Sequence, residues 1–144
     1  MRRSTFQPIH KVNRLGAAMV ELALVLPIFV AIIFGILEFG RAFMVHEMMT
    51  HASRIGARTA VLPFNNSNND VKTKVESALA DGSVPVSDVT VSILVNGTEG
   101  SIANAKRGDL VMVKATVPYS KVSLITPQFL SNYSVVGVTA MRRE

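Results

Sequence analysis

The stretch Gly16-Ala17-Ala18-Met19-Val20-Glu21 and the apolar run LALVLPIFVAIIFGIL that follows it over residues 22–37 decide how the chain is organised. Between Leu15 and Leu37 the only charged residue is Glu21. As an α-helix rising ~1.5 Å per residue, this segment is roughly 35 Å long, which is enough to cross a hydrocarbon core of ~30 Å. The stretch therefore predicts a membrane-spanning helix.

The sequence in front of this run is basic. Residues 1–16 contain no acidic residue, whereas the whole chain has 15 Lys+Arg against 10 Asp+Glu; the basic residues of this arm are Arg2, Arg3, Lys11 and Arg14. Because the excess charge lies in a short arm and not on a folded face, we expect no nucleic-acid partner. The positive-inside rule predicts a cytoplasmic N-terminus and an extracytoplasmic C-terminal part. The chain has no cysteine, which excludes disulfides and thiolate metal sites.

A secretory signal peptide also combines a basic start with an apolar core. Two features argue against that interpretation. Glu21 lies inside the apolar region, and no A-x-A-type cleavage site ends it before the chain continues into Glu38-Phe39-Gly40-Arg41. We therefore expect residues 1–16 to form a leader and the following helix to stay in the membrane.

The helical pattern continues beyond the membrane segment and ends before Pro63, because the residue preceding proline disfavours the α conformation. We expect one helix over residues 17–62, with about residues 17–40 in the membrane and a kink near Pro27. In its second half, three- to four-residue spacing predicts an apolar face and a polar one. The expected apolar positions are Met44, Met48, Ala52, Ile55 and Leu62, and the expected polar ones are Glu47, His51, Arg54 and Arg58.

Residues 63–144 predict a small α+β domain. After a polar loop at residues 64–69, an N-cap pair of Ser67 and Asp70 and the apolar positions around residues 71–79 predict a short helix that Gly82 ends. Period-two alternation then predicts about three antiparallel strands. Their apolar positions are Val89, Val91, Ile93 and Val95; Val111, Val113, Ala115, Val117 and Tyr119; and Val136, Val138 and Ala140, with a turn at Asn96-Gly97. Three strands cannot bury a core alone, so the sheet is expected to cover the second half of the long helix.

Two motifs resemble known sites but have simpler interpretations. His46 and His51 are five residues apart, which places them on different helical faces, whereas a zinc protease needs a spacing of four. Arg107-Gly108-Asp109 looks like an adhesion tripeptide, but Gly and Asp are ordinary residues of the turn that must precede a strand. We find no catalytic constellation, and we expect neither enzymatic activity nor a metal or cofactor.

Glu21 allows two interpretations. In the first, it lies near the cytoplasmic interface of a plain membrane anchor. In the second, a peptidase cuts after Gly16, so that Ala17 gains a free α-amine with an ordinary pKa near ~7.7–8.0. That amine pairs with the Glu21 carboxylate of an adjacent subunit and sets the axial register. A stripe of small residues, Ala52, Gly56 and Ala60, would also allow another backbone to approach closely.

These features resemble the prepilin family and, within it, the TadE-like pseudopilins of the tight-adherence (Flp-type) pilus machinery. The resemblance rests on the basic leader, on AAMVELALVLPIF after Gly16, on Glu38-Phe39-Gly40-Arg41, and on Ala52-Ser53-Arg54-Ile55-Gly56-Ala57-Arg58. Gly108-Asp109 before the strand that ends in Tyr119, and the closing Met141-Arg142-Arg143-Glu144, are also similar. One departure is Leu22, where the major pilin has an aromatic residue, which favours a minor pilin or pseudopilin.

The resemblance implies a pilin-like fold, cleavage by a prepilin peptidase between Gly16 and Ala17, and assembly through the N-terminal helix. The expected helix–helix interface comprises Glu21, Pro27, Ala31, Gly35, Ala52, Gly56 and Ala60. The implied partners are other pilin or pseudopilin subunits, the peptidase and the assembly platform of the bacterial inner membrane. The implied localisation is that membrane, with a single pass, or the pilus fibre. The alternative is an unprocessed, membrane-anchored module that binds an extracytoplasmic ligand.

Overall fold

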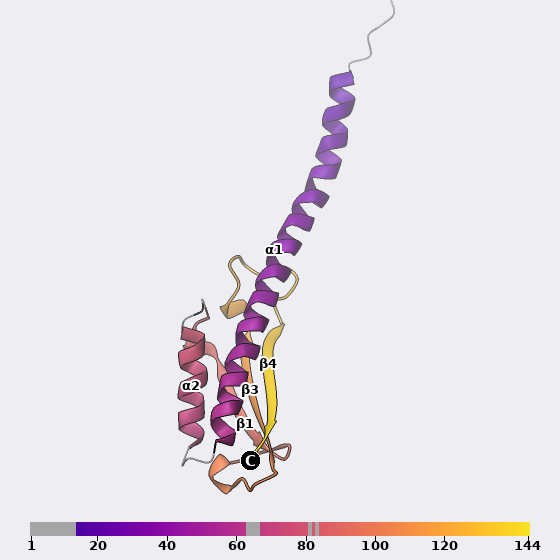
Figure 1. The fold of residues 1–144 in the computed structure, drawn as a ribbon. Coiled ribbons are helices and arrows are strands. Elements are labelled where there is room, and N and C mark those ends of the chain that lie inside the picture. Colours follow the sequence, from indigo (N-terminus) through magenta and orange to yellow (C-terminus); the bar gives the residue numbers. More distant parts are fainter. Residues whose placement is uncertain (1–13, 63–66, 81, 83) are drawn as a thin grey trace, which may run out of the picture. The chain divides into compact units, whose positions relative to one another are not determined.

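The computed structural model describes residues 14–62, 67–80, 82 and 84–144 (Figure 1). The predicted leader lies outside these residues except at positions 14–16, and the predicted polar loop lies outside them except at positions 67–69. The chain divides into two compact units, Met1–Ile36 and Leu37–Glu144. Helix α1 (Arg14–Val61) contributes to both.

The described part of the first unit is the N-terminal half of α1. Its large apolar side chains are exposed, from Met19 at 69% to Ile36 at 67%. In the described part of the chain, α1 is the one helix long and apolar enough to cross a membrane. This supports a membrane-anchored protein. Pro27 stays inside the helix, and the kink expected there stays a prediction.

The second unit contains the rest of α1, helix α2 (Asn68–Ala80) and an antiparallel sheet, with three short 3₁₀ helices between them. The strands are β1 (Thr90–Val95), β2 (Thr98–Glu99), β3 (Leu110–Pro118) and β4 (Ser134–Arg142), in the order β2-β1-β3-β4. The 3₁₀ helices are η1 (Val86–Asp88), η2 (Ile102–Asn104) and η3 (Tyr119–Lys121). The expected α+β class, with a long helix leading into a small domain, is confirmed.

The fourth strand, β2, is two residues long and follows the predicted turn. Asn96 and Gly97 have φ values of 52° and 88°, the left-handed conformations that a tight hairpin turn requires. The turn returns the chain to β1, where Val95 pairs with Thr98. The turn predicted at Asn96-Gly97 is thus confirmed. The strand that follows it, β2, is too short to show an alternation of apolar and polar residues.

Helix α2 begins as its sequence predicts. The amide of Asp70 donates to Ser67 Oγ at 3.2 Å, and the amide of Ser67 donates back to the Asp70 carboxylate at 2.7 Å. This reciprocal cap satisfies two backbone donors that a helix start would leave open. The hydrogen bonds from Ser67 also lower the pKa of Asp70.

The prediction for the last strand was wrong about which face is buried. Val136, Val138 and Ala140 do share a face, but Val138 is 43% exposed, whereas Val135 and Gly137 are buried. The cause is a close approach of β4 to α1. A Cβ on Gly137 would lie 2.5 Å from the amide nitrogen of Thr50 and nearer still to the carbonyl group of Met49.

The apolar face expected for the second half of α1 was also wrong in part. Met44 and Leu62 are 52% and 41% exposed, while Val45 and Met49 are fully buried. The helix packs against both α2 and the sheet, so its buried residues form a broad band of mainly small side chains. They are Arg41, Val45, Met49, Ala52, Ser53, Gly56, Ala57 and Ala60. The expected polar positions, Glu47, His51, Arg54 and Arg58, are all exposed.

Candidate functional site

The residues expected to form the helix–helix interface divide between the two units. Glu21, Pro27 and Ala31 are exposed in the first unit, and Gly35 is half-buried. Their exposure on an apolar helix leaves them free for contacts with lipid or with other helices. No contact to another chain tests them here, so their role in assembly stays a prediction.

The remaining three, Ala52, Gly56 and Ala60, lie in the core of the second unit. A Cβ on Gly56 would come within 2.5 Å of a Val75 methyl on α2 and 3.2 Å of a Val113 methyl on β3. The groups that lie closest to Gly56 are therefore side chains of the same chain. Packing within the subunit accounts for this stripe, and it leaves the exposed residues of the first unit as the candidates for contacts between subunits.

The second unit holds a polar cluster where α1 enters it. The carboxylate of Glu38 accepts hydrogen bonds from three consecutive backbone amides, those of Gln128 at 3.2 Å, Phe129 at 3.0 Å and Leu130 at 2.7 Å. Hydrogen bonds to an ionised acceptor are stronger than those between neutral groups. Glu38 thus fixes the backbone of a loop about 90 residues away in the sequence.

Arg41 and Tyr119 complete this cluster. The Nε of Arg41, a residue only 8% exposed, donates to the carbonyl of Val122 at 2.9 Å. The hydroxyl of Tyr119 donates to the backbone carbonyl of Glu38 at 2.8 Å. Burial raises the pKa of Tyr119, and the negative charge of Glu38 acts in the same direction, while Arg41 opposes them. The phenol therefore keeps its proton and remains a donor.

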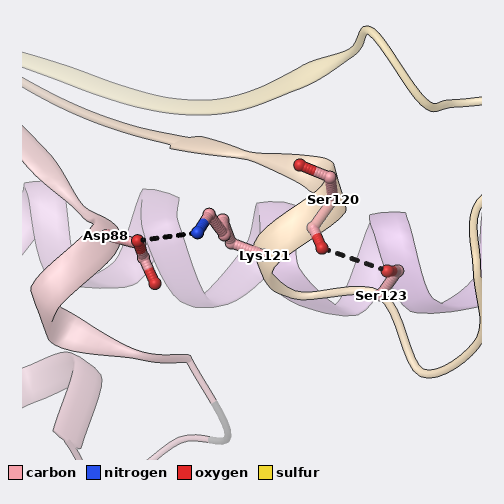
Figure 2. Close-up of polar contacts among 4 residues, drawn as sticks. All are labelled: Asp88, Ser120, Lys121 and Ser123. Atoms are coloured by element: carbon pink, nitrogen blue, oxygen red, sulfur yellow. Dashed lines mark hydrogen bonds and ion pairs between the residues drawn. The ribbon is translucent and has the colours of Figure 1, made fainter.

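The start of the same loop has its own anchor in η3. Lys121 Nζ lies 3.6 Å from the Asp88 carboxylate, and Ser123 Oγ donates to the Ser120 carbonyl at 3.4 Å (Figure 2). Lys121 is 56% exposed, so we expect this ion pair to contribute little to stability. The buried contacts of Arg41 and Tyr119 are the stronger restraints.

Replacing Tyr119 with phenylalanine tests this cluster. The change removes one buried hydrogen bond and no packing volume, so we expect a loss of about 1 kcal/mol in the free energy of unfolding. That corresponds to a fall of about 4 °C in the melting temperature, which circular dichroism of the detergent-solubilised protein can measure. The control is Tyr133→Phe at the other tyrosine, which is 52% exposed. Equal melting temperatures for the two variants would contradict the role of the Tyr119 hydroxyl.

Of the two motifs that resembled known sites, one lies on an exposed face of α1 and the other forms a turn. His46 and His51 are both exposed on α1, and the described residues contain no group of three or more His, Cys, Asp or Glu side chains that could hold a metal ion. Gly108, with φ of 93°, forms a turn. The Asp109 carboxylate closes that turn by accepting from Asn96 Nδ2 and the Lys106 amide, and these hydrogen bonds lower its pKa.

Together, the two units define a class of protein: an apolar helix able to span a membrane, continuing into a small α+β domain that is fixed to its second half. Residues 16–58 match the family model described as TadE-like protein. The resemblance drawn from the sequence is confirmed over this segment. No curated protein and no solved structure matches the chain.

Glu38, Arg41 and Tyr119 belong to family-like motifs in the sequence, but no sequence pattern predicts that they lie together. The available signal was the pair of opposite charges three residues apart directly after the apolar run, with a tyrosine at the end of the longest alternating strand. The loop that these residues hold has no regular pattern. The contact between this loop and Glu38 therefore became visible only in the structure.

Proposed function

We propose that the protein is a minor pilin or pseudopilin of a Tad (Flp-type) pilus assembly and secretion system. In this proposal a prepilin peptidase cuts between Gly16 and Ala17, and the subunit then assembles through the N-terminal half of α1. The protein works as a structural subunit and not as an enzyme. Its partners are other pilin or pseudopilin subunits and the assembly platform of the inner membrane.

The observation that carries this proposal is the TadE-like match, which covers Gly16, Glu21 and the whole apolar run in one segment. Exposure supports it, because an unpaired helix with this much exposed apolar surface is not stable in water and requires lipid or other helices. In lipid, the carboxylate of Glu21 would cost roughly 2.5–3.5 kcal/mol without a partner. The free amine of Ala17 on a neighbouring subunit supplies that partner.

The intact mass and N-terminal sequence of the protein extracted from membranes test the proposal. We expect a mature chain that starts at Ala17. Gly16→Leu should leave the chain uncut, and its side chain should be tolerated because nothing lies within 4 Å of a Cβ at this position. Gly40→Ala, at a second glycine with open space around it, is the control and should be processed normally.

Other mature starts would contradict the proposal in different ways. A start at Met1 or Arg2, in a cell that contains the peptidase, would indicate an unprocessed membrane-anchored module. A start well beyond Leu37 would indicate a cleaved secretory signal, and the assembly helix would then be lost.

A further inference from the structure

The segment between η3 and β4, residues 122–133, is an exposed loop without charged side chains, which we call the base loop. Three of its large apolar side chains face solvent, with exposed fractions of 78% for Leu124, 50% for Ile125 and 56% for Phe129. A group of apolar side chains exposed in this way marks a surface that contacts another phase or molecule. The position of the base loop along α1 indicates whether it contacts lipid or protein.

The base loop is fixed to α1 on both sides of these side chains. On one side, Arg41 Nε holds the carbonyl of Val122 at 2.9 Å. On the other, the Glu38 carboxylate accepts from three successive amides, the last being that of Leu130 at 2.7 Å. Figure 1 shows the loop, drawn in tan between η3 and β4, running beside α1. Glu38 and Arg41 lie within one turn of the helix, so the whole loop is held at one level of α1.

That level is the one at which α1 would leave the membrane. Glu38 is the first charged residue after Glu21, and the apolar run ends at Leu37. The first charge after an apolar span marks the end of the hydrocarbon region. At the same level α1 exposes Phe39 and Phe43, which are 47% and 70% accessible. Aromatic side chains beside polar groups are typical of segments that lie in a membrane interface.

We propose that the base loop docks on the extracytoplasmic surface of the membrane that α1 spans, with Leu124, Ile125 and Phe129 inserted into the lipid interface. This inference rests on the membrane anchoring in the proposed function and adds a second lipid contact. The absence of charge in the loop lowers the cost of insertion. Its polar residues, Ser123, Thr126, Gln128 and Ser131, suit the headgroup region.

The alternative occupant of this surface is a neighbouring subunit. A contact between proteins would place no requirement on where along α1 the loop is attached. Attachment to the first charged residue beyond the apolar run is what a membrane contact requires. The experiment separates the two.

The chain has no cysteine, so single-cysteine variants can be labelled without background. Leu124→Cys and Phe129→Cys report on the base loop. Ala103→Cys, exposed in η2, is the control. Arg143, next to the end of β4 opposite the base loop, donates to the Ile102 carbonyl of η2, so η2 lies at the other end of β4. Ile28→Cys, 59% exposed in the apolar run, reports on the membrane span.

The full-length variants are labelled with an environment-sensitive fluorophore and reconstituted into phosphatidylethanolamine–phosphatidylglycerol vesicles that contain spin-labelled lipid. We expect quenching at positions 124, 129 and 28 and none at 103. In the unlabelled proteins, a water-soluble thiol reagent should modify positions 124 and 129 about tenfold more slowly than 103. The large apolar side chains that remain in each variant still hold the loop in lipid, and burial of one such side chain shifts the partition by roughly tenfold or more.

Each other outcome has a defined meaning. Quenching at 28 without quenching at 124 and 129 overturns the docking and leaves the anchor intact. Absence of quenching at 28 overturns the membrane helix itself, and with it the proposed function. A third outcome is that positions 124 and 129 are protected from the thiol reagent but not quenched by the spin-labelled lipid, and that this protection increases with protein density. It would overturn lipid docking and indicate a contact between subunits.

A variant of the anchor provides a second test. Glu38→Ala removes the acceptor for three loop amides, and we expect quenching at position 124 to fall toward the level at 103. Asp88→Asn weakens only the exposed ion pair with Lys121 and should leave the quenching unchanged. Equal quenching in both backgrounds would show that Glu38 does not position the loop on the membrane.

Discussion

Replacing Gly137 with alanine is expected to destabilise the Leu37–Glu144 unit by about 3 kcal/mol or more. The added Cβ would overlap with the backbone of Met49 and Thr50 in α1, and a backbone cannot move aside as a flexible side chain can. The same approach carries the hydrogen bond from Ser53 Oγ to the Gly137 carbonyl at 2.8 Å. To admit the methyl group, β4 must separate from the helix and lose this bond.

Thermal unfolding of the detergent-solubilised chain, followed by circular dichroism, measures this effect, and we expect the melting temperature to fall by about 10 °C or more. Gly40→Ala is the matched control. It adds the same methyl group to a helical glycine with nothing within 4 Å, so it should stabilise the helix by about 0.5–1 kcal/mol. If both variants melt at the temperature of the parent protein, β4 does not approach α1 as closely as described.

Replacing Glu21 with alanine is expected to abolish incorporation of the subunit into a pilus or pseudopilus. The side chain is exposed on α1, so its loss leaves the fold of the second unit unchanged. The variant loses the ion pair between the Glu21 carboxylate and the Ala17 amine of the next subunit. This ion pair offsets the cost of holding both charges in a medium of low dielectric constant. Immunoblots of sheared surface material and of membranes would measure incorporation against total protein.

Glu47→Ala is the control for this variant, because Glu47 is also an exposed glutamate on α1 but lies in the second unit. It should be incorporated like the parent chain. Glu21→Gln, which keeps the shape and removes the charge, should behave like Glu21→Ala if the charge is what matters. Normal incorporation of Glu21→Ala would exclude the role of this residue in subunit registration.

The sequence predicted local features of the fold well. The Ser67–Asp70 cap, the Asn96-Gly97 turn and the alternation of β3 each depend on residues close together in the chain, so their patterns are complete within a short window. The family-like segment around Gly16 and Glu21 was also recognisable, because length, charge and apolar character are visible without any tertiary contact.

The errors arose where tertiary packing favours small residues over large apolar ones. Hydrophobicity favoured Val136 and Val138 over Gly137 as the buried face of β4, although the helix backbone leaves room only for glycine. In α1 the three- to four-residue spacing placed Met44 on the apolar face, whereas its neighbour Val45 is the buried residue. The contact of Glu38 with the base loop joins segments about 90 residues apart, and no periodicity encodes such a pair.

The contacts that join α1 to the rest of the Leu37–Glu144 unit also have a mechanical consequence. They begin at Glu38 and Arg41, continue at Met49 and Ser53 against Gly137, and reach the buried Ala60 near the end of the helix. A force that pulls α1 along its axis therefore acts on all of these contacts at once and in shear. They do not break one after another. Whatever draws the helix forward carries the whole Leu37–Glu144 unit with it.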